Sequence, residues 1–184
     1  MFIQTESTPN PATLKFLPGQ TVLSTGSADF PTEESSSASP LAARLFRVEG
    51  VEGVFFGPDF ITITKGDQDW AHLKPAILGV IMEHFASGQP VMMTDARADH
   101  AAHDGPDAQI VDQIKELLDT RVRPAVAQDG GDITFHGFEE GVVYLHMRGA
   151  CAGCPSSTMT LKMGIENLLK HYVPEVAEVR PVGV

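Results

Sequence analysis

The two cysteines of the chain, Cys151 and Cys154, are separated by only two residues. A thiol pair at this spacing can exchange electrons with a partner disulfide, and it can also supply two ligands of a metal site. Gly149 and Gly153 lie beside and within the pair, so the backbone can fold tightly and turn both sulfurs to one side. The residues around the pair therefore predict reactive sulfur, either redox-active or metal-binding.

The pair falls in an expected loop between a strand that ends near Met147 and a helix that starts near Ser156. Pro155 and the serines after it are typical of the first turn of a helix. The N-terminal end of a helix carries a partial positive charge and N–H groups without helical partners, and both stabilise a thiolate relative to a thiol. We therefore expect the two thiols to ionise readily, for redox chemistry or for metal binding.

The number of available ligands constrains the metal-binding interpretation. Zinc and iron–sulfur sites usually take four protein ligands, and this chain has only two cysteines. A mixed site within one chain would need histidines, and the candidates are His136, His146 and His171. His136 and His146 lie on expected strands with no evident focus on the cysteine pair. Two chains related by a two-fold axis, each donating one pair to a shared cluster, would form a homodimer that needs no further ligand.

Other classes of protein stay open at this point. A thioredoxin-like thiol–disulfide protein would carry its cysteine pair early in a βαβ unit, whereas here only one expected strand follows the pair. A zinc-linked structural dimer would use the same thiols, and a client adaptor would not need them. Cysteines that are simply buried are a further interpretation, which the flanking glycines and the helix-start position disfavour.

The composition argues against several classes of function. The 184-residue chain has a formal net charge of −11, spread along its length, which argues against binding to nucleic-acid phosphates. No apolar run approaches the roughly 20 residues of a membrane span, and the first residues resemble neither a secretory signal nor a transit peptide. We therefore expect a cytoplasmic protein with no nucleic-acid or membrane partner, or a mitochondrial-matrix protein if the chain is a processed organellar form.

Residues 1–88 are expected to form a first module of helices and strands. The expected strands are residues 2–5, 13–17, 51–56 and 60–64, and the expected helices are residues 40–46 and 70–86. Ser39 and Pro40 are typical of a helix start, and the Ser-rich residues 31–39 are expected to be a polar loop. The apolar residues at helical spacing in the second helix are expected in the core: Trp70, Leu73, Ile77, Ile81 and Phe85.

Residues 89–106 lose all periodicity and are expected to be a linker, in which His100 and His103 are interpreted as solvated side chains. Residues 107–184 are expected to form the second module. It has a helix over about 108–123 closed by Pro124, a tight turn at 129–132, strands 133–138 and 142–147, a helix over 156–172 and an edge strand over 176–179. Both modules mix helices with largely antiparallel sheet, so the expected class is α+β, with two small domains on a flexible linker.

Several stretches of the sequence resemble a known family. GACAGCPSSTMTLKMGIE, which contains the cysteine pair, resembles the signature of the NifU-like C-terminal domain, and RPAVAQDGGDITF resembles the opening segment of the same domain. MFIQTESTPNPATLKFLPGQ, SPLAARLF and VFFGPDFITITK resemble the Nfu N-terminal domain. Apart from the linker, nearly the whole chain is similar to the Nfu-type iron–sulfur cluster scaffold and carrier proteins.

The resemblance implies a 4Fe–4S cluster bridged between two subunits by Cys151 and Cys154 of each, then delivered to apo-proteins; a 2Fe–2S form is the alternative. It also implies an upstream iron–sulfur donor and apo iron–sulfur clients as partners. Residues 1–88, which contain no cysteine, are expected to select clients. No nucleophile triad, phosphate-binding glycine loop or nicotinamide signature occurs, so we expect a carrier and not an enzyme. A thiol–disulfide redox protein is the alternative function.

Overall fold

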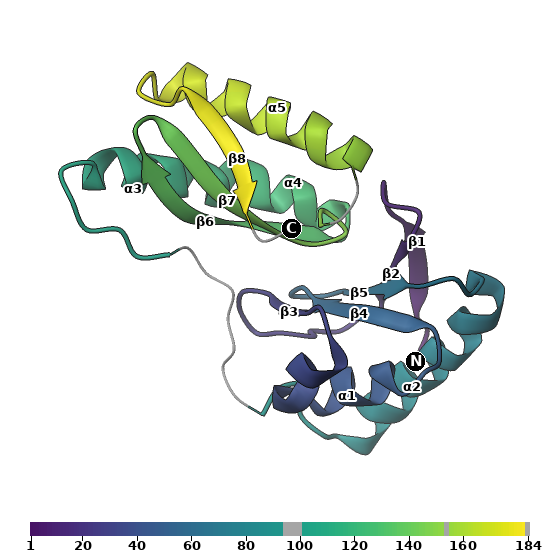
Figure 1. Cartoon of the computed structure of the whole chain (residues 1–184). Helices are drawn as coiled ribbons and strands as arrows, with labels where there is room; N and C mark the ends of the chain where they lie inside the picture. The colour runs from purple at the N-terminus through teal and green to yellow at the C-terminus, as the bar shows by residue number, and fades with distance from the viewer. Residues whose placement is uncertain (94–100, 153–154, 183–184) are drawn as a thin grey trace. The chain divides into compact units, whose positions relative to one another are not determined.

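The computed structural model describes residues 1–93, 101–152 and 155–182, and for residues 155–158 it describes the backbone alone. The chain forms two compact units, Met1–Ala98 and Asp99–Val184, each of which combines helices with a sheet (Figure 1). The α+β class expected from the sequence is confirmed. In the part of the chain that the structure describes, no helix is long and apolar enough to cross a membrane.

The first unit is a five-stranded antiparallel sheet with helices on one face (Figure 1). Its strand order is β1-β2-β5-β4-β3, and the strands are β1 (Gln4–Ser7), β2 (Thr13–Leu17), β3 (Ala28–Phe30), β4 (Val51–Phe56) and β5 (Ile61–Lys65). The covering helices are α1 (Pro40–Phe46) and α2 (Trp70–Ser87). As expected, Leu73, Ile77 and Ile81 of α2 are buried in the core, with Trp70 and Phe85 packed at its edge.

Two elements of this unit were not predicted from the sequence. Strand β3 has only three residues, and its register is set by distant pairing with β4, Ala28 opposite Phe56. The expected polar loop contains a short 3₁₀ helix, η1 (Glu33–Ala38), capped by Thr32, with Ser36 buried. The start of α1 is as expected, because the Ser39 side chain accepts the N–H of Ala42 as an N-cap.

The second unit is a three-stranded sheet with the order β6-β7-β8. Strands β6 (Gly131–Glu139) and β7 (Val142–Gly149) form an antiparallel hairpin, and β8 (Glu178–Val182) pairs parallel with β7. Helix α5 (Pro155–Tyr172) makes the crossover from β7 to β8 that a parallel pair requires. Alternate residues of the strands, such as Val143 and Leu145, pack with α3 (Ala108–Leu117), α4 (Arg123–Gln128) and α5 into one core.

The prediction that Pro124 closes the first helix of this unit is wrong. The chain continues from α3 through a π-helical turn, η2 (Leu118–Val122), into α4, and the helical path ends only at Gln128. Pro124 lies in the first turn of α4, where its missing N–H removes no hydrogen bond. The predicted tight turn follows directly, with Gly130 at a positive φ of 82°.

Each end of the expected 89–106 linker is attached to its own unit. The Met93 N–H donates to the Ala38 carbonyl over 2.8 Å, and the Ala101 N–H donates to the Phe135 carbonyl over 2.8 Å. The His103 ring packs edge-on against the Phe135 ring, with the centroids 6.2 Å apart. His103 is therefore not a purely solvated linker residue, whereas His100 lies outside the described residues.

His84 of α2 is a buried titratable group in the core of the first unit. Its side chain has no exposed surface, and within the described residues neither ring nitrogen has a hydrogen-bond partner. Burial, and secondly the charge of Arg44, lower the pKa of His84 below its usual 6.5. Because the unfolded chain binds this proton more tightly, the folded unit keeps its full stability above about pH 6.5 and loses stability as the pH falls towards the lowered pKa.

We expect the His84→Leu variant to lose part of the acid sensitivity of the first unit. The unfolding midpoint would be followed by fluorescence of Trp70, the single tryptophan of the chain, between about pH 8 and pH 5. Each unit of pKa depression corresponds to about 1.4 kcal/mol of stability lost on acidification. His72→Leu, at an exposed position of the same helix, is the control that keeps the wild-type slope. Equal slopes in wild type and His84→Leu would contradict the assignment.

Candidate functional site

Cys151 lies in the loop between β7 and α5, and its side chain packs into the core of the second unit with 6% of its surface exposed. Helix α5 begins at Pro155, directly after the cysteine pair, as the sequence predicts. Cys154 lies outside the described residues. The structure therefore places one of the two predicted ligand residues, on the inner side of the loop.

A close contact with the start of β6 holds Cys151 in place. A Cβ atom at Gly131 would lie 2.5 Å from the Cys151 Sγ and 2.9 Å from the Arg148 carbonyl oxygen. The Ala150 N–H donates to the Gly130 carbonyl over 3.2 Å, and the Cys151 N–H donates to Arg148 over 3.3 Å. Only glycine fits at position 131, so the glycine turn and the cysteine loop pack as one body.

The surroundings of Cys151 favour the protonated thiol. Burial raises the pKa of Cys151 to about 12, and the carboxylates of Asp129 and Asp132 add to the effect. The expectation that both thiols ionise readily is therefore wrong for Cys151 in this conformation, because burial and two carboxylates outweigh the partial charge of the following helix end. A metal ion that binds this sulfur must displace its proton.

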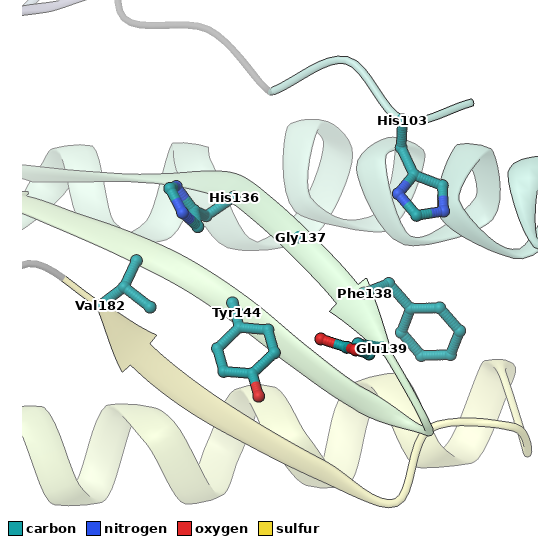
Figure 2. Close-up of a pocket in the computed structure, with 7 residues that line it drawn as sticks. All are labelled: His103, His136, Gly137, Phe138, Glu139, Tyr144 and Val182. Carbon is teal, nitrogen blue, oxygen red and sulfur yellow. The ribbon is translucent and has the colours of Figure 1, made fainter. Parts of the chain in front are cut away.

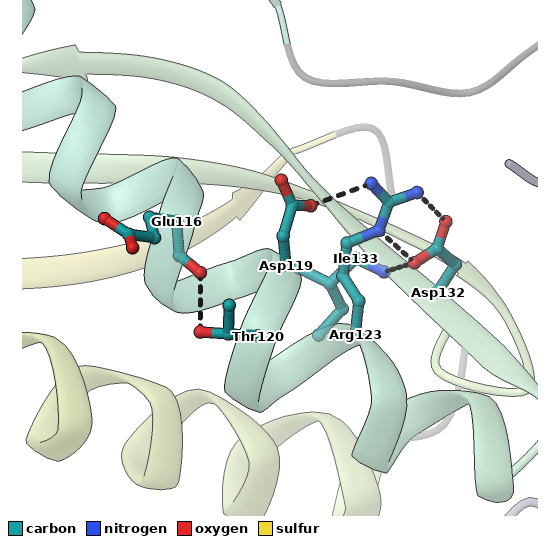
Figure 3. A network of polar contacts seen from close by, with 6 residues as sticks. All are labelled: Glu116, Asp119, Thr120, Arg123, Asp132 and Ile133. Carbon is teal, nitrogen blue, oxygen red and sulfur yellow. Dashed lines mark hydrogen bonds and ion pairs between the residues drawn. The ribbon is translucent and has the colours of Figure 1, made fainter.

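An ion pair fixes the other side of the same turn (Figure 3). Arg123, at the start of α4, donates from Nε and Nη2 to the two carboxylate oxygens of the buried Asp132, over 2.9 and 2.8 Å. Asp119 accepts a third bond from Arg123 over 3.1 Å, and Asp132 also accepts the N–H of Ile133 over 2.9 Å. Burial alone would lower the pKa of Arg123, but its bonds to Asp132 and Asp119 raise it. The bidentate pair ties α4 to β6 beside Gly131.

The sequence analysis did not single out this ion pair. Its sequence signal is a basic residue at the start of α4 and an acidic residue after the two glycines, within RPAVAQDGGD. Arg123 and Asp132 meet only because the chain turns back from α4 onto β6. The sequence analysis placed the end of the helix at Pro124 and therefore did not predict this turn.

The histidines weighed as further ligands do not converge on Cys151. His136 and His146 lie on the solvent face of the sheet, whereas the adjacent Met147 points to the opposite face and packs in the same core as Cys151. His171 lies at the far end of α5, against the Tyr172 ring. In residues 1–93, 101–152 and 155–182, no group of three or more His, Cys, Asp or Glu side chains could hold a metal ion.

A shallow pocket lies beside β6 and β7 of the second unit (Figure 2). Its lining includes His103, His136, Glu139 and Tyr144. Figure 2 shows His136 and Tyr144 on the strands and His103 on the segment that precedes α3. Cys151 is not among the residues that line this pocket.

We expect Gly131→Ala to displace Cys151 and to destabilise the second unit by about 1–3 kcal/mol, because the new methyl group overpacks against Sγ and a backbone oxygen. Urea unfolding measures the free-energy change. Alkylation followed by peptide mass spectrometry should show a faster reaction at Cys151, because the displaced thiol is more exposed to the reagent.

Gly164→Ala is the matched control for this substitution. A Cβ at Gly164 in α5 would have no heavy atom within 4 Å. Alanine there should stabilise the apo-protein by about 0.5–1 kcal/mol and leave Cys151 alkylation unchanged. If Gly131→Ala were as stable as Gly164→Ala, the packing account of the cysteine loop would be wrong.

Comparison with known proteins agrees with the two units. Residues 3–88 match the family model described as scaffold protein Nfu/NifU N terminal, and residues 114–180 match the NifU-like domain. The chain is 53% identical over 184 residues to the human NFU1 iron–sulfur cluster scaffold homolog, mitochondrial, covering 99% of this chain and 72% of the relative. It is 54% identical over 182 residues to NifU-like protein 5, mitochondrial, of Arabidopsis thaliana, covering 96% and 66%.

The chain spans only about two thirds of the length of the two Arabidopsis relatives, 66% and 64%. A NifU-like protein from Saccharomyces cerevisiae, solved in solution, is 30% identical and covers 52% of this chain and 87% of its own, with a TM-score of 0.47.

These matches define a protein with an Nfu N-terminal domain followed by a NifU-like domain. The chain belongs to the Nfu family, and the resemblance seen in its sequence is confirmed.

Proposed function

We propose that this chain is an iron–sulfur cluster carrier, which holds a 4Fe–4S cluster between two copies through Cys151 and Cys154 of each copy and passes it to apo-proteins. The observation that carries the proposal is the ligand supply: one cysteine pair per chain, and histidines that face away from Cys151. The names of the relatives, iron–sulfur cluster scaffold homologues, support the same cargo. A 2Fe–2S cargo would use the same thiols.

In this mechanism the cysteine loop has a closed state and a loaded state. In the closed state the Cys151 sulfur packs against Gly131 and is protonated. Loading turns the sulfur out of the core and replaces its proton, and the N-terminal end of α5 offsets part of the cargo's negative charge. Client thiolates then displace the carrier's thiolates. The return of the Cys151 sulfur to its packed position against Gly131 favours release of the cluster.

The partners in this proposal are an upstream iron–sulfur donor and apo iron–sulfur clients, and the chain acts as a carrier and not as an enzyme. The first unit contains no cysteine, so it supplies no thiolate and is proposed to select clients. Relatives named as mitochondrial are compatible with the organellar alternative for the location, and the cytoplasmic location stays a prediction.

We expect anaerobic reconstitution of the wild-type chain with iron and sulfide to give a coloured dimer that contains one four-iron cluster per two chains. Cys151→Ser and Cys154→Ser should each lose the cluster and stay folded, because each removes a thiolate from both halves of the site. Iron and sulfide analysis, visible absorption and native mass spectrometry on one sample measure these outcomes.

The double variant His136→Ala/His146→Ala is the control for a mixed ligand set, and it should load as well as wild type. Full cluster retention in either serine variant would refute the ligand assignment. A colourless monomer that forms a Cys151–Cys154 disulfide and reduces a model disulfide would favour the thiol–disulfide alternative, and a colourless zinc dimer would favour a structural site.

We expect removal of residues 1–88 to leave cluster loading intact and to slow transfer to at least one apo-protein client. The first unit has its own core and the cluster ligands lie in the second unit, so the two activities should separate. Transfer is measured by the appearance of holo-client activity. Unchanged rates for every client tested would remove the proposed role of this unit.

A further inference from the structure

The exposed apolar side chains of the second unit are concentrated on α5. Among its described residues, the large hydrophobic side chains that are exposed are Met159, Met163 and Tyr172, all on this helix. Met159 and Met163 are 68% and 60% exposed and lie one helical turn apart. At 100° per residue Met163 lies on the side of α5 opposite Ile165 and Leu169, which are buried in the core. Two methionines therefore occupy the centre of the solvent face, where a polar side chain is usual.

The five residues that form the exposed face around these methionines include no charged residue. We call the stripe formed by Met159, Thr160, Met163, Gly164 and Asn167 the methionine stripe; all five residues are exposed. The charged side chains on the first four turns of α5 are engaged within the chain. Lys162 pairs with Glu178 over 3.9 Å, and Glu166 pairs with Lys170 over 2.8 Å and accepts the N–H of Val179.

Gly164 is a glycine that the described chain does not explain. Its backbone is helical, so it does not need the positive φ that glycine permits, and a Cβ there would meet no atom within 4 Å. Glycine in a helix interior costs stability relative to alanine. A close approach by another backbone is one packing reason for a small residue at such a position.

We propose that the methionine stripe is the surface on which a second copy of this chain packs when the cluster is loaded, with α5 of one copy against α5 of the other across a two-fold axis. The inference rests on the proposed shared cluster. The stripe begins five residues after Cys154, so the copy that donates the missing thiolates must come close to it. The site is incomplete without that copy.

Electrostatics favour this face for self-association. Each chain has a formal net charge of −11, so two copies repel each other over most of their surface. The methionine stripe contains no carboxylate of its own, and the nearest one on the helix, Glu166, is paired with Lys170, so two acidic chains repel each other less at this face. Methionine side chains are flexible and polarizable, which suits packing that forms and separates repeatedly.

The stripe is too small to hold a dimer without the cargo. From Met159 to Asn167 the helix rises about 12 Å, so the buried area falls well below the roughly 1,200–2,000 Å² of stable interfaces. The shared cluster therefore supplies most of the association, and the dimer separates when the cargo leaves. This dependence matches a carrier that must open its site to a client.

The test compares three full-length proteins, each loaded anaerobically with iron and sulfide. Met159→Glu/Met163→Glu places two carboxylates on the stripe, and Met82→Glu/Met93→Glu places two on exposed methionines of the first unit as a charge-matched control. Sedimentation over a range of concentrations gives the dimer affinity. We expect the stripe variant to dimerise about tenfold more weakly than wild type, with partial recovery at high salt, and the control to match wild type.

Gly164→Ala is a second variant that keeps the test independent of folding defects. It should raise the stability of the apo-protein and weaken the loaded dimer, a combination that a purely structural role for Gly164 would not give. Unchanged dimerisation in both the stripe variant and Gly164→Ala would overturn the inference about the surface. The proposed shared cluster would not be affected by that result. Normal dimerisation with slower transfer to an apo-ferredoxin would assign the stripe to a client and also overturn it. A wild-type chain that loads as a monomer would instead refute the proposed function.

Discussion

The contact between Gly131 and the cysteine loop is the constraint on which the proposed site depends. It leaves no room for a side chain at position 131, and it presses the Cys151 sulfur into the core of the second unit. Because β6 and β7 are paired on both sides of an irregularity at His136, the position of this contact is set by the register of the hairpin, with Gly131 opposite Gly149. A change anywhere in that register would move the thiol.

The helices and strands around the cysteine loop are themselves held by contacts on two sides. On one side the Arg123–Asp132 ion pair ties α4 to the start of β6. On the other side the parallel pairing of β8 with β7 holds the strand that follows α5. If the chain loads as proposed, we expect the sheet and helices to keep their positions. In our proposal the methionine stripe, which lies on α5, presents a preformed surface.

Local sequence signals predicted the helices and strands that are determined by residues close together in the sequence. Helix α2 follows from apolar residues at helical spacing, and α1 from the Ser39 cap and Pro40. The hairpins follow from alternating apolar residues, and the position of the cysteine pair between strand and helix was predicted in the same way. Family resemblance, and not residue spacing, indicated the order of the two domains.

Features set by distant contacts were not predicted. Strand β3 is too short to show alternation and exists because β4 offers it a partner. Pro124 was taken to end a helix, but a π-helical turn allows it to start the next one. The burial of Cys151 depends on a glycine from another strand, so a local argument about the helix end gave the wrong preference for its protonation state. The Arg123–Asp132 pair was hidden for the same reason.

The buried state of Cys151 also bears on how the chain withstands oxidants when it is empty. Peroxide attacks the thiolate far faster than the thiol, and irreversible sulfinic and sulfonic acids form only after that first attack. With its pKa raised to about 12 and its sulfur enclosed against Gly131, Cys151 is a poor target in the apo-protein. Under the proposed function, an unloaded copy would therefore keep this cysteine chemically intact during oxidative exposure.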